Sequence, residues 1–367
     1  MKYYIIAGEA SGDLHASNLM KELKALDTTA QFRCWGGDLM KEQGAQLVKH
    51  YRDLAFMGFT EVLMNLRTIL NNISFCKKDV LAHRPDVLIL VDYPGFNIRI
   101  AEFAKTAGIK IFYYISPQIW AWKQSRVHKI KRVVDKMFVI LPFEKEFYQR
   151  FNFPVDFVGH PLLDAVQNYS TTLNTLSVDT DKPIIALLPG SRKQEISTML
   201  PLMLSIKKQY KNYQFVIAGA PSQNKEFYKE FITDEDVQIV FNQTYQLLQK
   251  SEAALVTSGT ATLETALFGI PEVVCYKGGT ISYTIAKNLI KVKYISLVNL
   301  IMDKLIVTEL IQNELNETNL KIELDKLLEP ITRTKIVADY NTLKHKLGGP
   351  GASKKTAELM VGYLRKS

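Results

Sequence analysis

The carboxylate of Asp92 stands where it could act as a general base. Asp92 directly follows the nearly all-apolar run 86–91, and such a run predicts a strand buried on both faces. A carboxylate at the end of this strand could accept the proton of an attacking hydroxyl group. The alternative is an ordinary strand-ending turn built from Asp92, Pro94 and Gly95.

A second polar loop, Gly8–Asp13 (GEASGD), follows the first apolar run of the chain. Its spacing is not the GxGxxG of dinucleotide-binding folds, and no GK[ST] follows as in a P-loop. Two acids beside a helix start, Glu9 and Asp13, favour a neutral, hydroxyl-rich ligand over a phosphate. The alternative is structural: Ser11 caps the helix and Asp13 complements its dipole.

The turn Pro189–Arg192 (PGSR) has the properties of an anion site. It follows an apolar run and opens an expected helix. Gly190 lets the backbone approach a ligand closely, and the N–H groups from Ser191 onward favour an anion, as does the helix dipole. Arg192 adds a fork of donors suited to a pyrophosphate. The alternative is a plain turn with an exposed arginine.

A second junction of this kind is Thr257–Glu264 (TSGTATLE). Its small side chains and N–H groups come from Ser258, Gly259, Thr260 and Ala261. Glu264 could accept hydrogen bonds from ribose hydroxyls, or Thr260 and Glu264 could be ordinary helix-start residues. Two anion-suited junctions in one half of the chain predict a nucleoside diphosphate site. We also assign to this site Gly219, which directly follows the apolar run 214–218.

Two further stretches suit lipid or polyanionic ligands. Trp120 and Trp122 precede a basic series: Lys123, Arg126, His128, Lys129, Lys131 and Arg132. This stretch could hold a phosphorylated or lipid-bearing ligand, could bind nucleic acid, or could be a solvated basic face with packed indoles. The apolar segment 54–59 (LAFMGF) could touch a membrane surface or acyl chains, or pack in the core.

Alternating short strands and longer helices must position these residues. Strands are expected at 2–7, 32–35, 86–91, 109–115, 136–141, 155–158, 183–188, 214–218, 237–241, 253–257 and 272–276. Helices are expected at 11–26, 59–82, 260–268 and 352–365. This alternation predicts an α/β fold with parallel, doubly wound sheets. Ligands of such sheets bind at the carboxyl ends of the strands, where the candidate residues lie.

The length of 367 residues suits two domains. We expect a first domain at 1–167 and a linker at 168–182, which is rich in Ser, Thr, Asn and Asp. A second domain is expected at 183–347. A final helical segment at 348–367 begins with Gly-Gly-Pro-Gly.

Composition limits the class of protein further. Hydrophobic residues make up 47% and charged residues 23%, which excludes a disordered or fibrous chain. The net charge of +9 favours anionic partners. The three cysteines show no CxxC spacing and the histidines no ligand spacing, so neither a metal site nor a cofactor is expected. No apolar run is long enough to span a bilayer, and the first one is shorter than a signal-peptide core, so we expect a cytoplasmic protein.

The motifs, taken in order, resemble the lipid-A-disaccharide synthases, glycosyltransferase family 19. The matching segments are GEASGD (8–13), LAFMGFTEVL (54–63), VDYPGFN (91–97), SPQIWAWKQSRV (116–127), FVGHPLLD (157–164), LLPGSRKQEI (187–196), TSGTATLETAL (257–267) and YISLVNLI (294–301). They cover nearly the whole chain, and the combination of GEASGD, WAW and PGSR is specific to this family.

The resemblance implies a GT-B fold, in which two Rossmann-like domains face a cleft, with the acceptor on the first domain and the UDP-sugar on the second. The implied reaction joins UDP-2,3-diacylglucosamine to 2,3-diacylglucosamine 1-phosphate. It inverts the anomeric centre, yields the β-1,6-linked tetraacyl disaccharide 1-phosphate and UDP, and needs no metal. The family sits peripherally on the cytoplasmic face of the inner membrane. No nucleic-acid partner is implied, and a homodimer is left open.

Roles carry over where residues match. Asp92 takes the position of the general base, while Glu9 and Ser11 match the acceptor-side loop. Arg192 matches the arginine that faces the donor phosphates. Two further residues match positions near the nucleotide: Asn299 and Glu309.

Three positions depart from the family pattern. Gly95 stands where many members have Asp, Asp38 replaces a proline, and Thr308 replaces the proline before Glu309. The first change weakens any role for an acid at position 95.

Three other protein classes remain as alternatives. Another GT-B enzyme, a UDP-N-acetylglucosamine transferase or epimerase, would share the nucleotide site. A non-catalytic nucleic-acid-binding protein would fit the charge, although RNP, KH and helix-turn-helix signatures are missing. An NAD oxidoreductase is disfavoured because GxGxxG is missing.

Overall fold

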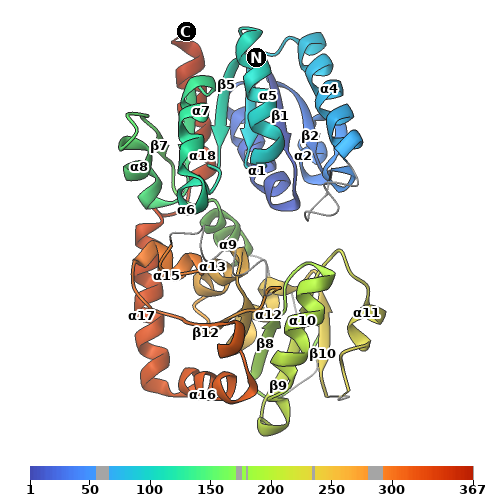
Figure 1. The fold of residues 1–367 in the computed structure, drawn as a ribbon, viewed down its shortest axis with the longest axis vertical. Coiled ribbons are helices and arrows are strands. Elements are labelled where there is room, and N and C mark those ends of the chain that lie inside the picture. The colour runs from blue at the N-terminus through green and yellow to red at the C-terminus, as the bar shows by residue number, and fades with distance from the viewer. Residues whose placement is uncertain (55–65, 171–175, 179–180, 234–235, 280–291, 367) are drawn as a thin grey trace. The chain divides into compact units, whose positions relative to one another are not determined.

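The computed structural model describes residues 1–54, 66–170, 176–178, 181–233, 236–279 and 292–366 (Figure 1). The chain divides into two compact units. The first comprises Met1–Asp164 together with Leu347–Ser367, and the second comprises Ala165–Lys346.

The first unit is built on a parallel seven-stranded sheet in the order β3-β2-β1-β4-β5-β6-β7. Its strands are β1 Lys2–Ala7, β2 Gln31–Gly36, β3 Gln46–His50, β4 Val87–Val91, β5 Lys110–Tyr114, β6 Lys136–Val139 and β7 Asp156–Phe157. Every residue of β4 is buried. The central strands are therefore continuous apolar runs, because a parallel sheet is covered on both faces.

The second unit is built on a parallel six-stranded sheet in the order β10-β9-β8-β11-β12-β13. Its strands are β8 Ile184–Leu188, β9 Gln214–Gly219, β10 Gln238–Phe241, β11 Ser251–Thr257, β12 Glu272–Tyr276 and β13 Thr308–Ile311. A core cluster of side chains from β8, β9, β10 and β11 packs on one face of this sheet, with Leu247 and Leu248 from the helix that follows β10.

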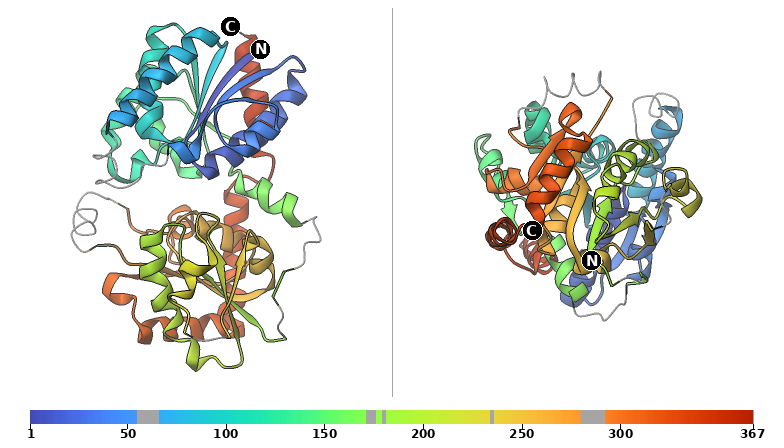
Figure 2. Two further views of the ribbon diagram at one scale, coloured as in Figure 1. Left: turned by 90° about the vertical axis from the view of Figure 1, so that its right-hand side faces the viewer. Right: turned by 90° about the horizontal axis from the view of Figure 1, so that it is seen from below.

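Helices cover both faces of each sheet (Figure 2). Those of the first unit are α1 Ala10–Leu26, α2 Asp38–Glu42, α4 Leu66–His83, α5 Pro94–Thr106, α6 Ile119–Trp122, α7 Val127–Val133, α8 Pro142–Gln149 and α18 Ala352–Arg365. The helix α9 Leu162–Ser170 spans the division between the units. Those of the second unit are α10 Lys193–Leu204, α11 Lys225–Lys229, α12 Thr244–Lys250, α13 Thr260–Leu267, α15 Leu297–Met302, α16 Glu317–Leu328 and α17 Pro330–Lys346.

Each sheet reverses its strand order at one point. In the first unit the chain winds from β1 outward to β3 and then returns to place β4 on the other side of β1. In the second unit the same reversal lies between the neighbouring strands β8 and β11. Loops at such a switch point leave the sheet in opposite directions and open a crevice for ligands. The loops that follow β1 and β4, and those that follow β8 and β11, are therefore the places to look for a site.

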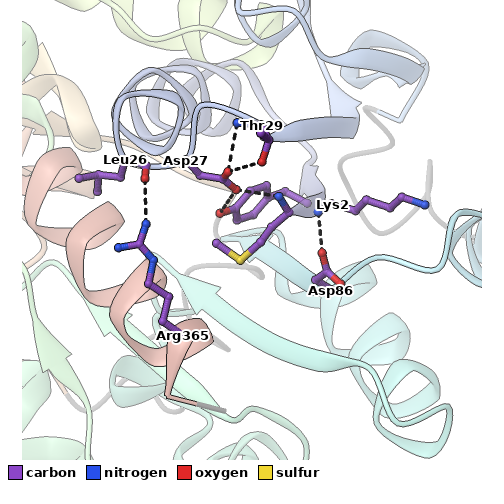
Figure 3. Close-up of polar contacts among 8 residues, drawn as sticks. Lys2, Leu26, Asp27, Thr29, Asp86 and Arg365 are labelled. Atoms are coloured by element: carbon purple, nitrogen blue, oxygen red, sulfur yellow. Dashed lines mark hydrogen bonds and ion pairs between the residues drawn. The ribbon is translucent and has the colours of Figure 1, made fainter.

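The C-terminal helix returns to the first unit and packs along α1. Arg365 donates a hydrogen bond to the Leu26 carbonyl at the end of α1, at 3.1 Å. Next to it, Asp27 accepts from the Met1 amino group at 2.8 Å and from Thr29 (Figure 3). At the other end of α18, Asp164 accepts hydrogen bonds from the Gly351 and Ser353 amides. This helix thus closes the first unit of its own chain.

The α/β class with parallel doubly wound sheets is confirmed, and two strands were missed. The strands β3 and β13 lie at sheet edges and are only partly buried, so they lack the apolar runs that marked the others. The segment expected as a linker is partly helical, because α9 extends to Ser170. The described part of the helix expected at 59–82 is α4, and residues 55–65 lie outside the described chain.

Candidate active site

Asp92 ends the buried strand β4 at the switch point of the first unit. Its backbone is left-handed (φ 44°), as is that of Tyr93 (φ 49°), a conformation that costs a non-glycine residue free energy. Burial, and then the nearby Glu9 carboxylate, raises the pKa of Asp92 to about 6. The structure therefore brings Glu9 and Asp92 close enough to interact, just after the adjacent strands β1 and β4.

The GEASGD loop packs tightly under the turn that follows β4. A Cβ atom at Gly8 would lie 2.3 Å from the Tyr93 ring, so only glycine fits there. Glu9 is the N-cap of α1, and no side chain caps this helix. The expectation that Ser11 caps the helix is therefore wrong. Ser11 is an exposed residue of the first helical turn, where its hydroxyl is accessible to solvent.

Asp13 does not face a ligand. It is 3% exposed, and its carboxylate accepts hydrogen bonds from the backbone amides of Gly37, Leu39 and Met40 at 2.7–3.2 Å. These are the amides at the start of α2, whose first residue is Asp38. Asp13 lies in the first turn of α1, as expected, and its carboxylate also caps α2. Glu9 is therefore the acid of this loop that remains to contribute to a site.

Two residues beside Asp92 were missed by the sequence reasoning. The Asn97 side-chain amide donates to the Asp92 carbonyl at 2.8 Å, and the Tyr113 hydroxyl donates to the same oxygen at 2.5 Å. Both side chains are fully buried. Asn97 gave little signal, because it is one of several polar residues of α5, and Tyr113 reads as an ordinary core residue of β5.

The tryptophan and basic stretch is partly structural. Trp120 is 8% exposed and meets the Phe143 ring edge-on, so it packs as a core residue. Within the basic series, Lys129 pairs with Glu102 at 2.8 Å. The side chains of Lys123, His128, Lys131 and Arg132 are exposed. The apolar segment 54–59 lies outside the described residues except for Leu54, which is buried.

In the second unit, the PGSR turn follows β8 and holds an internal carboxylate. The Ser191 and Arg192 amides donate to one Glu195 oxygen at 3.2 and 3.3 Å, and the Arg192 guanidinium donates to the other at 3.0 Å. Gly190 has φ 107°, and a Cβ atom there would lie 2.8 Å from that carboxylate. The donors expected to bind a phosphate thus already hold an anionic group, from the third residue of α10.

The loop after β9 supports this turn from the side. The Ser222 hydroxyl donates to the Ser191 carbonyl at 3.1 Å. A Cβ atom at Gly219 would lie 2.5 Å from the Phe241 ring, so glycine is required where β9 passes β10. Gly219 therefore has a packing role at this position.

The second junction follows β11, the neighbour of β8. Leu188 and Val256 are paired in register, so Gly190 and Ser258, each two residues further on, leave the same edge of the sheet. Gly259 is the N-cap of α13, and no side chain caps this helix. Gly259 and Thr260 are exposed and Ala261 is partly exposed. The start of α13 is thus accessible to an anion, and Thr260 is its first residue, as the helix-start alternative expected.

Glu264 lies one turn into α13 and is hydrogen bonded within the unit. Its carboxylate accepts from the Tyr245 hydroxyl at 2.9 Å, and burial raises its pKa. The Tyr245 ring contacts Phe268 with centroids 4.9 Å apart. One carboxylate oxygen is therefore held by Tyr245, beside an aromatic cluster.

Asn299 and Glu309 contact each other at 2.9 Å. Glu309 also accepts from the Ile295 and Ser296 amides, both at 2.9 Å. The Ile295 carbonyl in turn accepts from the Ser258 hydroxyl at 3.3 Å. These residues form one network that fixes the loop beside Ser258, so they act on the site through the backbone of that loop.

Membrane-spanning helices and metal-binding clusters are both absent from the described residues. None of the helices placed there is long and apolar enough to cross a bilayer. Within the same residues, no three His, Cys, Asp or Glu side chains are grouped so that they could hold a metal ion.

Several solved structures share this architecture. The UDP-GlcNAc 2-epimerase from Neisseria meningitidis, bound to UDP-GlcNAc, aligns over 100% of both chains with a TM-score of 0.70 and 15% identity. The glycotransferase of kitacinnamycin aligns over 99% of both chains with a TM-score of 0.67 and 12% identity. Such likeness shows the fold alone: two doubly wound units of the GT-B class.

The particular family follows from the sequence match. A family model described as lipid-A-disaccharide synthetase matches residues 3–361. The lipid-A-disaccharide synthase of Syntrophus aciditrophicus (strain SB) is 40% identical, over 99% of this chain and 98% of the relative. The chain therefore belongs to the lipid-A-disaccharide synthase family and is a glycosyltransferase, as its motifs predicted.

Proposed function

We propose that this glycosyltransferase moves the 2,3-diacylglucosamine group of its UDP derivative to the 6-hydroxyl of 2,3-diacylglucosamine 1-phosphate. The observation that carries the proposal is that the switch-point edges of the two sheets in this chain differ in chemistry. The first unit ends its switch-point strands in the acids Glu9 and Asp92. The second ends its own in glycines, small hydroxyls and Arg192.

The first unit binds and activates the acceptor in this proposal. Asp92 has a pKa of about 6, so near pH 7 it is mostly ionised yet basic enough to take a proton in the transition state. Its carboxylate accepts the proton of the 6-hydroxyl as that oxygen attacks the anomeric carbon. Glu9 and the exposed Ser11 hydroxyl offer hydrogen-bonding groups to the other sugar hydroxyls of the acceptor.

The second unit binds the donor and stabilises the leaving group. The bond between the anomeric carbon and the β-phosphate oxygen breaks, and UDP leaves with the negative charge that develops on that oxygen. In this proposal Arg192 and the amides at the starts of α10 and α13 stabilise that charge. Glu264 and the loop held by Asn299 and Glu309 support the ribose and the nucleotide. Attack opposite the leaving group inverts the configuration, which gives the β-1,6 linkage.

The decisive assay mixes purified protein with both acylated sugars and follows UDP release and a tetraacyl disaccharide 1-phosphate by mass spectrometry. The matched control replaces the donor with UDP-N-acetylglucosamine. We expect product only with the acylated donor. Turnover of UDP-N-acetylglucosamine without acylated product would instead assign the chain to the other GT-B chemistry.

We also propose that the protein works at the anionic face of the inner membrane, where both acylated substrates reside. The outer face of α4 supports this, because three large apolar side chains on it are 46–53% exposed: Leu70, Phe75 and Leu81. Exposed Arg67 and Lys78 lie on the same face, which is the composition of an interfacial helix. Flotation with vesicles that contain anionic phospholipid, at low and high salt, tests this. Protein that stays with the soluble fraction under both conditions would rule it out.

A further inference from the structure

The left-handed backbone of Asp92 needs an explanation, because neither burial nor sequence enforces it. Asp92 and Tyr93 adopt φ 44° and 49° in succession, a conformation that persists in non-glycine residues only where the surroundings determine it. The Asp92 amide still bonds the Tyr114 carbonyl of β5 at 3.1 Å. The chain therefore turns away from the sheet at the Asp92 carbonyl. A group that fixes this oxygen also fixes the direction of the Asp92 side chain.

Two fully buried donors converge on that single oxygen. The Tyr113 hydroxyl approaches from β5, and the Asn97 amide approaches from the first turn of α5. The Asn97 amide also lies 3.3 Å from the Val91 carbonyl, so it spans the last residue of the strand and the first residue of the turn. A carbonyl that accepts from two buried side chains is costly to displace, because both donors would lose their partner.

We propose that Tyr113 and Asn97 are positioning residues, which hold the Asp92 carbonyl and thereby aim and isolate the carboxylate that accepts the acceptor proton. The inference rests on the proposed role of Asp92 as general base. It goes further by assigning the orientation of that base to two residues that do not touch substrate. A displaced Asp92 would be more hydrated and further from Glu9, and its pKa would fall towards its ordinary value.

The chain offers a matched control one residue away. Tyr114 follows Tyr113 on β5 and, because strand side chains alternate, points to the opposite face. It is equally buried, but its hydroxyl lies near Ser353 and Thr356 of α18. Replacing either tyrosine with phenylalanine removes one buried hydroxyl from the same strand, but only the Tyr113 hydroxyl bonds Asp92.

The experiment measures kcat, KM and the pH profile of kcat for Tyr113→Phe, Tyr114→Phe and Asn97→Ala, together with UDP affinity and the thermal midpoint. We expect Tyr113→Phe to lower kcat about tenfold and to move the acidic limb of the profile to lower pH, with UDP affinity unchanged. Tyr114→Phe should leave kcat, the acidic limb and the UDP affinity at the parent values. Asn97→Ala should act as Tyr113→Phe does, and it tests the proposal independently if Tyr113→Phe does not fold.

Combination with Asp92→Asn separates this inference from the proposed function. In that background Tyr113→Phe should cause no further loss, because the group that it positions is gone. An unchanged pH profile and turnover in a folded Tyr113→Phe protein would overturn the inference while leaving Asp92 as the base. The same tenfold loss in the Asp92→Asn background would also overturn it. Near-normal turnover of Asp92→Asn alone would instead defeat the proposed base.

Discussion

The two switch-point edges of this protein have opposite chemistry and are held in opposite ways. In the first unit an acid sits on a strained backbone, and buried tyrosine and asparagine side chains reach it from outside the loop. In the second unit glycines and helix starts supply donors, and Glu195 occupies part of them from within the same turn. One edge is thus preorganised around the proposed base, while the other presents donors that the proposed donor phosphate would share with Glu195 or take from it.

The largest effect should come from removing the base. Asp92→Asn keeps the size of the side chain but cannot accept a proton, so we expect turnover to fall by about a hundredfold or more. UDP should still bind, because the donor groups lie in the second unit. Measured kcat with calorimetric UDP affinity checks both parts. Near-normal turnover would show that the acid edge does not carry the chemistry.

The pH profile tests the same edge without disabling it. Because the pKa of Asp92 is raised to about 6, turnover of the parent protein should fall as pH drops below about 6, where the base becomes protonated. Glu9→Gln removes the neighbouring negative charge that contributes to this rise, so the acidic limb should move to lower pH. An identical limb in parent and Glu9→Gln proteins would show that the two acids are not coupled.

At the other edge, Arg192→Gln should weaken UDP binding by about tenfold or more, since a guanidinium bonded to phosphate is lost. The acidic limb that reports Asp92 should stay in place. The matched variant is Glu195→Gln, which keeps the side-chain length but removes the internal anion. We expect it to bind UDP a few times more tightly. Weaker UDP binding in Glu195→Gln would mean that Glu195 serves the site by orienting Arg192 and does not compete with phosphate.

The smallest effect on activity is expected at a buried acid away from both edges. Glu272 begins β12, is fully buried, and neither carboxylate oxygen has a hydrogen-bond partner among the described residues. Burial raises its pKa well above the ordinary value, so the folded state disfavours the ionised form. The stability of the parent should fall as pH rises above the ordinary pKa, by at most about 1.4 kcal/mol per pH unit, until the folded-state pKa is passed.

The control for this prediction is Glu272→Met, which has similar size and no charge. Its free energy of unfolding should match that of the parent near pH 4.5 and exceed it increasingly towards pH 8, with activity unchanged. Urea unfolding at several pH values measures the difference. A constant difference across this range would show that Glu272 does not titrate on unfolding, in contrast to the acid at the catalytic edge.

The sequence alone determined the fold class, the order of the central strands along the chain and the loops that carry the candidate site residues. Apolar runs on β1, β4, β8 and β11 were readable because both faces of a parallel strand are buried. The residues that follow these strands could therefore be named from the sequence as candidate site residues. The edge strands β3 and β13 were not readable, since half-buried strands carry no such run.

Only the tertiary structure decided which partner each polar side chain takes. Asp13 lies in the first turn of α1, as expected, but its carboxylate bonds the amides at the start of α2, about two dozen residues further along the chain. Tyr113 looked like core and bonds the carbonyl of the proposed base. Local patterns report propensity and burial, whereas a hydrogen bond between distant segments depends on where the sheet brings their ends together, and no local pattern encodes that position.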